Sequence, residues 1–369
     1  MQLLNWVIKM LHAMIIAGGG GTRFWPRSRN TRPKQFLCFH GDRSLLQNTF
    51  DRLESQIPAD RIWVLTGQRH RDEAIQQLPE LPEDNIVGEP MGRDTTACIG
   101  LGAALIAKQD PQATILVSPA DHVIEPVQEF RRTLQAAEQI VEEHPHALVT
   151  FGIPPTFPST GYGYIHRGPL LTHRQGIAVY RVQQFKEKPK AETAEQFLVS
   201  GEYFWNSGIF IWKAKTILQE LKRLEPEIYK TLEVIAENWD TPQRMPIFTS
   251  EYSEKLKKIS IDFAVMEKAK EVLVLQAPYQ WDDVGSWLAL ERRLPQDVHG
   301  NTIQGLHSGI KTQQCVIVSD GNHLITTIGI EDLLIIQDGN CLLIANRKEE
   351  ETVKHLVDQL KKQQLEKYL

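Results

Sequence analysis

Cysteine, net charge and long apolar runs are all scarce in this sequence. Only four cysteines occur among 369 residues; they are widely spaced and form no C-x-x-C pair. This spacing argues against a disulfide framework or a zinc site and favours reduced thiols in a cytoplasmic protein. No run of about 20 uninterrupted apolar residues is present, so no membrane-spanning helix is expected. The formal net charge of −5 gives no general attraction for nucleic acid or for an anionic membrane, and neither is expected as a partner.

Two well-known glycine signatures are also missing, although glycines 18–21 form a cluster directly after a short apolar run. A P-loop ends in Gly-Lys-Ser/Thr, and the dinucleotide fingerprint needs a third glycine where Arg23 or Phe24 stands. A kinase or a dehydrogenase is therefore not favoured. The segment does provide a turn that can adopt positive φ and expose consecutive N–H groups to a phosphate or a nucleobase.

Cations follow the glycine cluster closely. A glycine-rich turn alone is as often a structural turn as a binding loop. Arg23 directly after the turn, and Lys34 preceded by proline, favour a polyphosphate site, because two fixed cations can offset charge on transferred and leaving phosphates. The neighbouring Arg27, Arg29 and Arg32 are interpreted as solvated or salt-bridged.

Short apolar runs alternate with amphipathic stretches from residue 13 to about residue 153. This alternation is typical of β-α-β units and predicts an α/β fold with a Rossmann-like, doubly wound mixed sheet. Ligands of such sheets bind at the carboxyl ends of the strands. The glycine cluster and the segments 88–94 and 118–122 all follow predicted strands, so we expect them at one edge of the sheet.

The composition changes near residue 295. Residues 299–346 contain short β-rich runs separated by Gly, Asp and Asn, and residues 348–369 have the pattern of a charged amphipathic helix. We therefore predict a short disordered leader over residues 1–9, a main domain over 10–294, and a small β-rich domain ending in a helix over 295–369. Two roles stay open for the small domain: covering the site, or pairing two copies as a homodimer.

At this point the motifs become specific. The segment A-G-G-G-G-T-R-F-W-P-R-S-R…P-K-Q-F, residues 17–36, resembles the signature of the sugar-1-phosphate nucleotidyltransferases, and its W-P-x-S-R…P-K-Q-F form resembles the mannose-1-phosphate guanylyltransferase group. Gly20 stands where Ser is common in that family. Further matches follow in the same order: G-E-P-M-G-R-D-T-T-A at 88–97, S-P-A-D-H at 118–122, T-G-Y-G-Y-I at 160–165, F-K-E-K-P at 185–189, W-N-S-G-I-F at 205–210, S-I-D-F-A-V-M-E-K-A at 260–269 and W-D-D-V-G-S-W at 281–287.

The resemblance implies a reaction between GTP and mannose 1-phosphate. In that family the sugar phosphate attacks the α-phosphorus of a nucleoside triphosphate and releases pyrophosphate. A phosphate monoester has a second pKa of about 6, so it is already anionic at pH 7 and needs no general base. The resemblance places Arg23 and Lys34 on the triphosphate and Lys188 on the sugar phosphate. The implied nucleotide-binding residues are Gly18, Gly19, Gly21, Thr22, Glu89, Pro90 and Arg93.

A metal site is implied as well. Mg²⁺ prefers oxygen ligands, usually one or two carboxylates with substrate phosphates. Asp121 and Asp283 match the family's metal-binding aspartates. Helix capping is the alternative role for Asp121, and either Asp282 or Asp283 is expected to serve as a cap; Asp283 is preferred as the ligand.

Sugar and base recognition need groups that pair with hydroxyls and with a guanine edge. Glu187 can accept hydrogen bonds from two vicinal hydroxyls, Asn206 can donate and accept, and Gly161 and Gly163 allow close approach of the backbone. Asp262 is assigned to the sugar, to a position behind the residues that contact the sugar, or to a helix N-cap. For guanine, the donors N1–H and N2–H₂ favour an acceptor such as Glu89 or the backbone of residues 89–93. Asp94 replaces the asparagine common in the family.

Two other functions are compatible with the same residues. One is transfer to a different sugar 1-phosphate, such as a heptose or glucose 1-phosphate. The other is a catalytically silent homologue that regulates a partner. Retention of the cations Arg23, Lys34 and Lys188, together with both candidate metal carboxylates, favours an active enzyme.

Overall fold

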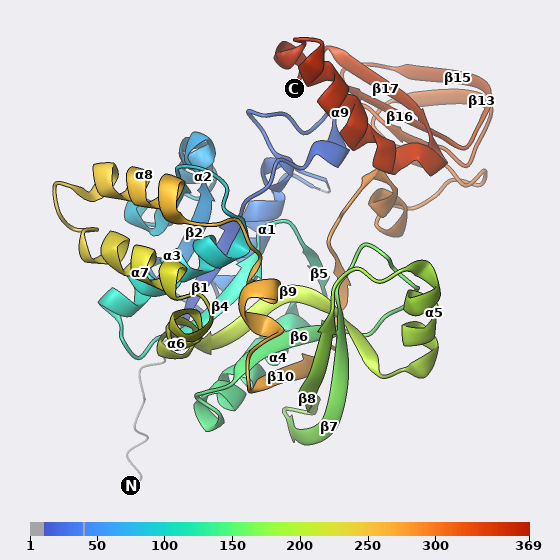
Figure 1. Cartoon of the computed structure of the whole chain (residues 1–369). Helices are drawn as coiled ribbons and strands as arrows, with labels where there is room; N and C mark the ends of the chain where they lie inside the picture. Colours follow the sequence, from blue (N-terminus) through green and yellow to red (C-terminus); the bar gives the residue numbers. More distant parts are fainter. Residues whose placement is uncertain (1–10, 40) are drawn as a thin grey trace, which may run out of the picture. The chain divides into compact units, whose positions relative to one another are not determined.

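The computed structural model of the chain describes residues 11–39 and 41–369 (Figure 1). The leader expected over residues 1–9 lies outside these residues. The chain divides into two compact units. The large unit contains residues up to 18 together with 49–120 and 124–281, and the small unit contains residues 19–48, 121–123 and 282–369. The small unit thus joins three separate stretches of sequence, a grouping that a single boundary near residue 295 does not anticipate.

The large unit is built on a nine-stranded mixed sheet with the strand order β3-β2-β1-β4-β9-β6-β10-β8-β7. Its first four strands run parallel, β9 is antiparallel to both of its neighbours, and β10 lies parallel to β6 and antiparallel to β8. The strands are β1 (Leu11–Ala17), β2 (Ile62–Gly67), β3 (Ile86–Glu89), β4 (Thr114–Pro119), β6 (Leu148–Ile153), β7 (Tyr164–Arg174), β8 (Ile177–Lys186), β9 (Tyr203–Lys213) and β10 (Val272–Gln276). The α/β fold with a mixed sheet, predicted from the sequence, is confirmed.

Helices of the large unit pack against this sheet or against one another (Figure 1). They are α2 (Arg71–Gln77), α3 (Asp94–Gln109), α4 (Val127–Glu143), α5 (Ala191–Ser200), α6 (Ala214–Leu224), α7 (Pro226–Glu237) and α8 (Arg244–Lys255). The helix α3 is buried over most of its length, because it packs against the sheet and also against α6 and α7. Three further elements contain residues of both units: α1 (Leu45–Leu53), β5 (Val123–Glu125) and β11 (Gln280–Asp282).

Two helices follow strand β9 in succession. The helix α6 ends at Leu224, and Pro226 occupies the first turn of α7, where its missing N–H has no cost. None of the helices within residues 11–39 and 41–369 is both long and apolar enough to cross a membrane.

The small unit contains a coil of short strands. Strands β12 (Thr302–Gln304), β14 (Val316–Val318) and β16 (Leu333–Asp338) lie side by side in parallel, and β17 (Cys341–Asn346) joins them antiparallel to β16. A second parallel pair is formed by β13 (His307–Gln313) and β15 (Ile325–Glu331). The β-rich domain and the helix after it are thus confirmed, although the helix α9 covers only Val353–Lys362.

The core of the small unit includes residues from the cation-rich segment. Phe24, Phe39 and Trp287 form a cluster of edge-to-face rings, with ring centroids 4.8 to 6.5 Å apart. Aliphatic side chains of β14, β16 and α9 complete this core. The apolar residues of α9 all lie at least partly buried against it, so α9 does not offer the exposed apolar face that would favour a homodimer.

Candidate active site

The glycine turn follows β1 and continues into a short 3₁₀-helix, Thr22–Phe24. Gly19 and Gly21 have φ of 91° and 57°, a region that favours glycine. A Cβ on Gly21 would lie 2.4 Å from the Cβ of Lys34, so no larger residue fits there. The Ser28 hydroxyl donates to the Gly21 carbonyl at 2.7 Å and holds the turn in place.

Lys34 connects the glycine turn to both residues proposed as metal ligands. Its side chain is buried, and its Nζ donates to Oδ2 of Asp121 at 2.6 Å and to the backbone carbonyl of Asp283 at 2.5 Å. Desolvation raises the pKa of Asp121, but Lys34 and His122 outweigh it, and the net pKa lies below the usual value. Asp121 is therefore ionised at neutral pH.

The two neighbouring aspartates at 282 and 283 have different surroundings. Asp282 is buried, pairs with Arg292 at 2.6 Å and accepts a hydrogen bond from the N–H of Val284. These contacts give Asp282 a structural role at the turn. The backbone carbonyl of Asp283 accepts a hydrogen bond from Lys34. The Asp283 carboxylate lies against Gly285, where an added Cβ would be 3.0 Å from one of its oxygens. Of the two aspartates, Asp282 is thus the one whose side chain accepts a hydrogen bond from the backbone of the turn.

Arg23 lies on the exposed side of the turn. Its side chain is 44% exposed and pairs with Glu351, itself 73% exposed, at 3.4 Å. A pair this open to solvent contributes little, so the guanidinium can change partners.

No group of three or more His, Cys, Asp or Glu side chains within residues 11–39 and 41–369 is arranged to hold a metal ion. Asp121 and Asp283 nevertheless suit Mg²⁺, because that ion takes one or two carboxylates and completes its shell with water and phosphate oxygens. Both residues belong to the same unit and contact the Lys34 ammonium group, Asp121 through its carboxylate and Asp283 through its backbone carbonyl.

The segment after β3 carries the predicted nucleotide residues Glu89, Pro90 and Arg93. The carboxylate of Glu89 is buried and accepts a hydrogen bond from the hydroxyl of Tyr252. Burial raises the pKa of Glu89 to about 7, and hydrogen bonds from Tyr252 and Cys98 only partly oppose the shift. The Arg93 guanidinium donates to the Ser253 carbonyl.

Tyr252 is a residue that the sequence did not indicate. It lies on α8, 163 residues from Glu89, in a stretch without a recognisable motif. Asp94, which replaces the common asparagine, has φ of 67°, and its carboxylate accepts from the N–H of Thr95 at 2.8 Å. Asparagine and aspartate both tolerate a positive φ, so aspartate at this position allows the same backbone conformation as asparagine.

The predicted sugar residues come together from four separate segments. The Asn206 Nδ2 donates to Oδ1 of Asp262 at 2.8 Å, and the Asn206 N–H donates to the Gly163 carbonyl at 2.8 Å. A Cβ on Gly163 would lie 2.6 Å from a carboxylate oxygen of Glu187, which explains the glycine. Lys188 donates to the other Glu187 oxygen at 2.7 Å. Gly161 lies in the loop before β7, where its N–H donates to the Ser159 hydroxyl at 3.2 Å.

Burial and like charge act together on the carboxylates of this cluster. Desolvation raises the pKa of Asp262 to about 6, the Asn206 hydrogen bond opposes the rise, and the charge of Glu187 adds to it. Asp262 also begins a π-helical turn, Asp262–Met266. The residue that caps this turn is Ile261, and the Asp262 side chain accepts a hydrogen bond from Asn206, so Asp262 is not an N-cap.

The structure thus has a mixed α/β sheet with a glycine turn directly after strand β1, and sheets of this kind bind ligands at the carboxyl ends of their strands. Residues 12–298 match the family described as Nucleotidyl transferase, and residues 305–360 match the MannoseP isomerase/GMP-like beta-helix domain.

Known proteins narrow this class. The chain is 38% identical over 356 residues to mannose-1-phosphate guanylyltransferase of Salmonella montevideo, which covers 95% of the chain and 74% of that relative. It is 37% identical to mannose-1-phosphate guanylyltransferase of Escherichia coli K12, with 95% and 73% covered. The crystal structure of mannose-1-phosphate geranyltransferase from Thermus thermophilus aligns with a TM-score of 0.84 and 32% identity, covering 95% of this chain and 99% of that one. The chain belongs to the mannose-1-phosphate guanylyltransferase group of the nucleotidyl transferase family.

Changing Glu89 to Gln should alter how stability depends on pH. The native pKa of about 7 lies above the ordinary value of 4.5, so the folded state loses stability as pH rises through this window. The glutamine side chain cannot ionise but can still accept from Tyr252. Glu89→Gln should therefore gain stability relative to the wild type between pH 5 and pH 8, by on the order of 3 kcal/mol at most. Thermal unfolding at several pH values measures this, with exposed Glu80→Gln as the control; a difference that stays constant with pH would contradict it.

Changing Gly21 to Ala should damage the glycine turn itself. The new methyl would meet the Lys34 side chain at 2.4 Å and force a φ of 57° on alanine. Displacing Lys34 by even about 1 Å can lower turnover on the order of 10²-fold. Gly41→Ala is the matched control, because Gly41 has φ of 70° but nothing within 4 Å of a Cβ. Equal pyrophosphate release by the two variants would show that the contact with Lys34 is unimportant.

Proposed function

We propose that this protein transfers GMP from GTP to α-D-mannose 1-phosphate, forming GDP-mannose and pyrophosphate. The observation that carries the proposal is the similarity to mannose-1-phosphate guanylyltransferases, which spans 95% of the chain and includes both the sheet and the coil of strands. The presence of the candidate phosphate and sugar residues in two well-formed clusters supports it.

The proposed reaction is an in-line displacement at phosphorus. A phosphate oxygen of mannose 1-phosphate forms a bond to the α-phosphorus of GTP, and the bond from that phosphorus to the β-phosphate oxygen breaks. The electron pair leaves with pyrophosphate. The nucleophile is anionic at neutral pH, so the protein must supply position and opposite charge, and a Ser/His/Asp arrangement is not needed.

Lys34 and Arg23 are proposed to bind the triphosphate in different ways. Lys34 is fixed by two hydrogen bonds and lies against the glycine turn, so its charge needs no reorganisation during the reaction. Arg23 is exposed and weakly paired, and can leave Glu351 for a phosphate oxygen. The N–H groups of residues 18–22 would line the same turn, since glycine leaves them uncovered.

Asp121 and Asp283 are proposed to hold Mg²⁺ together with phosphate oxygens of the nucleotide. A bound Mg²⁺ would neutralise charge on the triphosphate. The low pKa of Asp121 favours this role, because the carboxylate is ionised and available to a cation throughout the neutral range.

Mannose is proposed to bind at the cluster of Gly161, Gly163, Glu187, Asn206 and Asp262. The carboxylates can accept from vicinal hydroxyls while Asn206 donates. Lys188, whose side chain is 63% exposed, is proposed to reach the sugar phosphate. For guanine we favour the backbone of residues 89–93 over the Glu89 side chain, because that carboxylate already accepts from Tyr252.

All four cysteines are free thiols in the structure, which supports the cytoplasm as the place of action. A homodimer stays a prediction.

Pyrophosphate release tests substrate choice directly. Purified protein with Mg²⁺ is assayed with each of GTP, ATP, UTP and dTTP against mannose 1-phosphate, glucose 1-phosphate and a heptose 1-phosphate. We expect release with GTP and mannose 1-phosphate. Release with another pair would keep the chemistry and overturn the specificity, and no release with any pair would favour the silent regulatory homologue. Omitting Mg²⁺ or adding a chelator should abolish release.

Removing either a cationic side chain proposed to bind phosphate or a proposed metal ligand should abolish turnover without unfolding the protein. Arg23→Ala deletes an exposed side chain, and Asp283→Ala keeps the backbone carbonyl that Lys34 uses. Both variants should lose pyrophosphate release while their thermal unfolding stays near that of the wild type. A large drop in unfolding temperature in either variant would assign that residue a structural role.

A further inference from the structure

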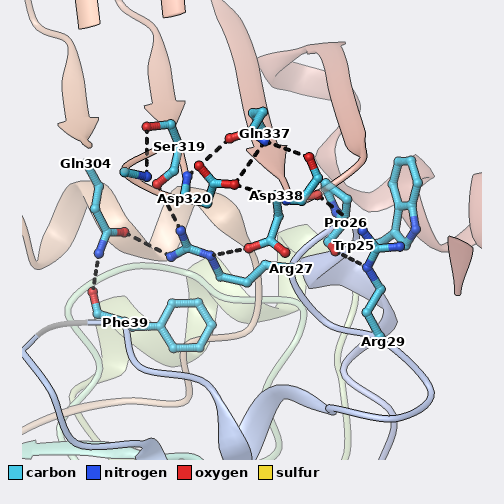
Figure 2. A network of polar contacts seen from close by, with 12 residues as sticks. Trp25, Pro26, Arg27, Arg29, Phe39, Gln304, Ser319, Asp320, Gln337 and Asp338 are labelled. Carbon is cyan, nitrogen blue, oxygen red and sulfur yellow. Dashed lines mark hydrogen bonds and ion pairs between the residues drawn. The ribbon is translucent and has the colours of Figure 1, made fainter. Parts of the chain in front are cut away.

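Arg27 inserts its guanidinium at the carboxyl end of the three parallel strands β12, β14 and β16 (Figure 2). Its Nη1 donates to Gln304, the last residue of β12, at 3.4 Å, and its Nη2 donates to the carbonyl of Ser319, directly after β14, at 3.2 Å. Its Nε donates to the carboxylate of Asp338, the last residue of β16, at 3.3 Å. One side chain thus joins three successive strand ends.

The acceptors are themselves held in place. Gln337 donates to the Asp320 carboxylate at 3.2 Å and accepts from the N–H of Asp320 at 3.2 Å, which fixes the turn that presents the Ser319 carbonyl (Figure 2). The Gln304 amide also donates to the Phe39 carbonyl at 3.1 Å. The acceptors of the Arg27 guanidinium are therefore fixed by hydrogen bonds of their own.

Arg29 makes a second connection from the same segment. Its guanidinium donates to the carbonyl of Tyr368 at 2.6 Å and to the carbonyl of Asp338 at 3.3 Å. The indole N–H of Trp25 donates to the same Tyr368 carbonyl at 2.8 Å. The expectation of salt-bridged arginines is thus confirmed for Arg27, and Arg29 is held by backbone carbonyls.

From Arg27 a short path leads to the glycine turn. Ser28, the next residue, donates to the Gly21 carbonyl at 2.7 Å. Gly21 lies against the Lys34 side chain, and Lys34 holds Asp121 and the Asp283 carbonyl. Every residue on this path belongs to the small unit.

We propose that Arg27 is a positioning residue for nucleotide binding: the coil of strands fixes Arg27, and Arg27 fixes the glycine turn and Lys34 in the geometry that receives a triphosphate. The inference rests on the proposed function for the identity of that triphosphate. If Arg27 has this role, the coil of strands contributes to the affinity for the nucleotide. A domain that folded without contacts to the glycine turn would make no such contribution. A guanidinium suits this role because its planar donors can reach several acceptors at once, which an ammonium cannot do.

The test is calorimetric binding of GTP with Mg²⁺, and separately of mannose 1-phosphate, to the full chain. Loss of a charged group's hydrogen bonds should raise the dissociation constant for GTP roughly tenfold in Arg27→Ala. The dissociation constant for mannose 1-phosphate should stay within about twofold, because its proposed residues lie in the large unit. Arg32→Ala is the matched control: Arg32 lies five residues on, is exposed, and should bind GTP as the wild type does.

Two conservative variants keep the test decisive if Arg27→Ala folds poorly. Asp338→Asn removes one charged acceptor and leaves Gln304 and the Ser319 carbonyl in place, so it should raise the GTP dissociation constant by a smaller factor. Arg27→Lys keeps the positive charge but loses the planar guanidinium with its several donors. Its dissociation constant for GTP should lie between those of the wild type and Arg27→Ala. Thermal unfolding of each variant shows that binding is measured on folded protein.

The proposal is overturned if Arg27→Ala and Asp338→Asn bind GTP like Arg32→Ala, or if GTP and mannose 1-phosphate lose affinity by the same factor. The second result would mean a general structural role. If the wild type binds another triphosphate in place of GTP, or binds GTP without turnover, the proposed function fails, and the same comparison of variants with the bound triphosphate still decides the role of Arg27. Absence of binding by every triphosphate to the wild type would overturn both.

Discussion

The interaction on which the candidate site depends is the buried ammonium of Lys34, held between the Asp121 carboxylate and the Asp283 carbonyl. A buried cation without partners would be costly, so these two contacts make its burial possible. The arrangement also brings residues 34, 121 and 283 to one place, although they are far apart in the sequence. The absence of a side chain at Gly21 follows from the same constraint, since Lys34 fills that space. The cluster proposed to bind phosphate is thus organised around one charge.

Much of the fold could be predicted because it depends on local patterns. The alternation of apolar runs and amphipathic stretches before residue 153 predicts the strands and helices that the structure contains. The region after β6 was harder to predict. Antiparallel β9 is inserted between β4 and β6, and β10 returns from more than 100 residues away to lie beside β6. Sheet order of this kind depends on pairing between distant strands, and no local pattern encodes it.

In the candidate site, too, features that depend on local sequence could be predicted, whereas contacts between distant residues could not. Motifs indicated the glycine turn, Lys34 and the carboxylates proposed to bind the sugar, because each lies in a short segment of characteristic composition. They did not indicate Tyr252, which donates a hydrogen bond to Glu89 from a helix without a motif. Nor did they indicate the acceptors of Arg27, because a salt-bridged arginine leaves no trace in sequence spacing when its partners lie about 300 residues away. The two compact units group the chain differently from a single boundary near residue 295, because residues 19–48 pack with residues that follow residue 282.

The coil of strands also has a length that cannot vary freely. Neighbouring strands in a sheet lie about 4.8 Å apart, so the ends of β12, β14 and β16 span two such intervals. Arg27 reaches across both with a single guanidinium. An extra turn of the coil between β12 and β16 would carry one acceptor beyond its reach, whereas a turn added after β16 would not disturb the three contacts. The three contacts of Arg27 therefore limit how many strands can lie between β12 and β16.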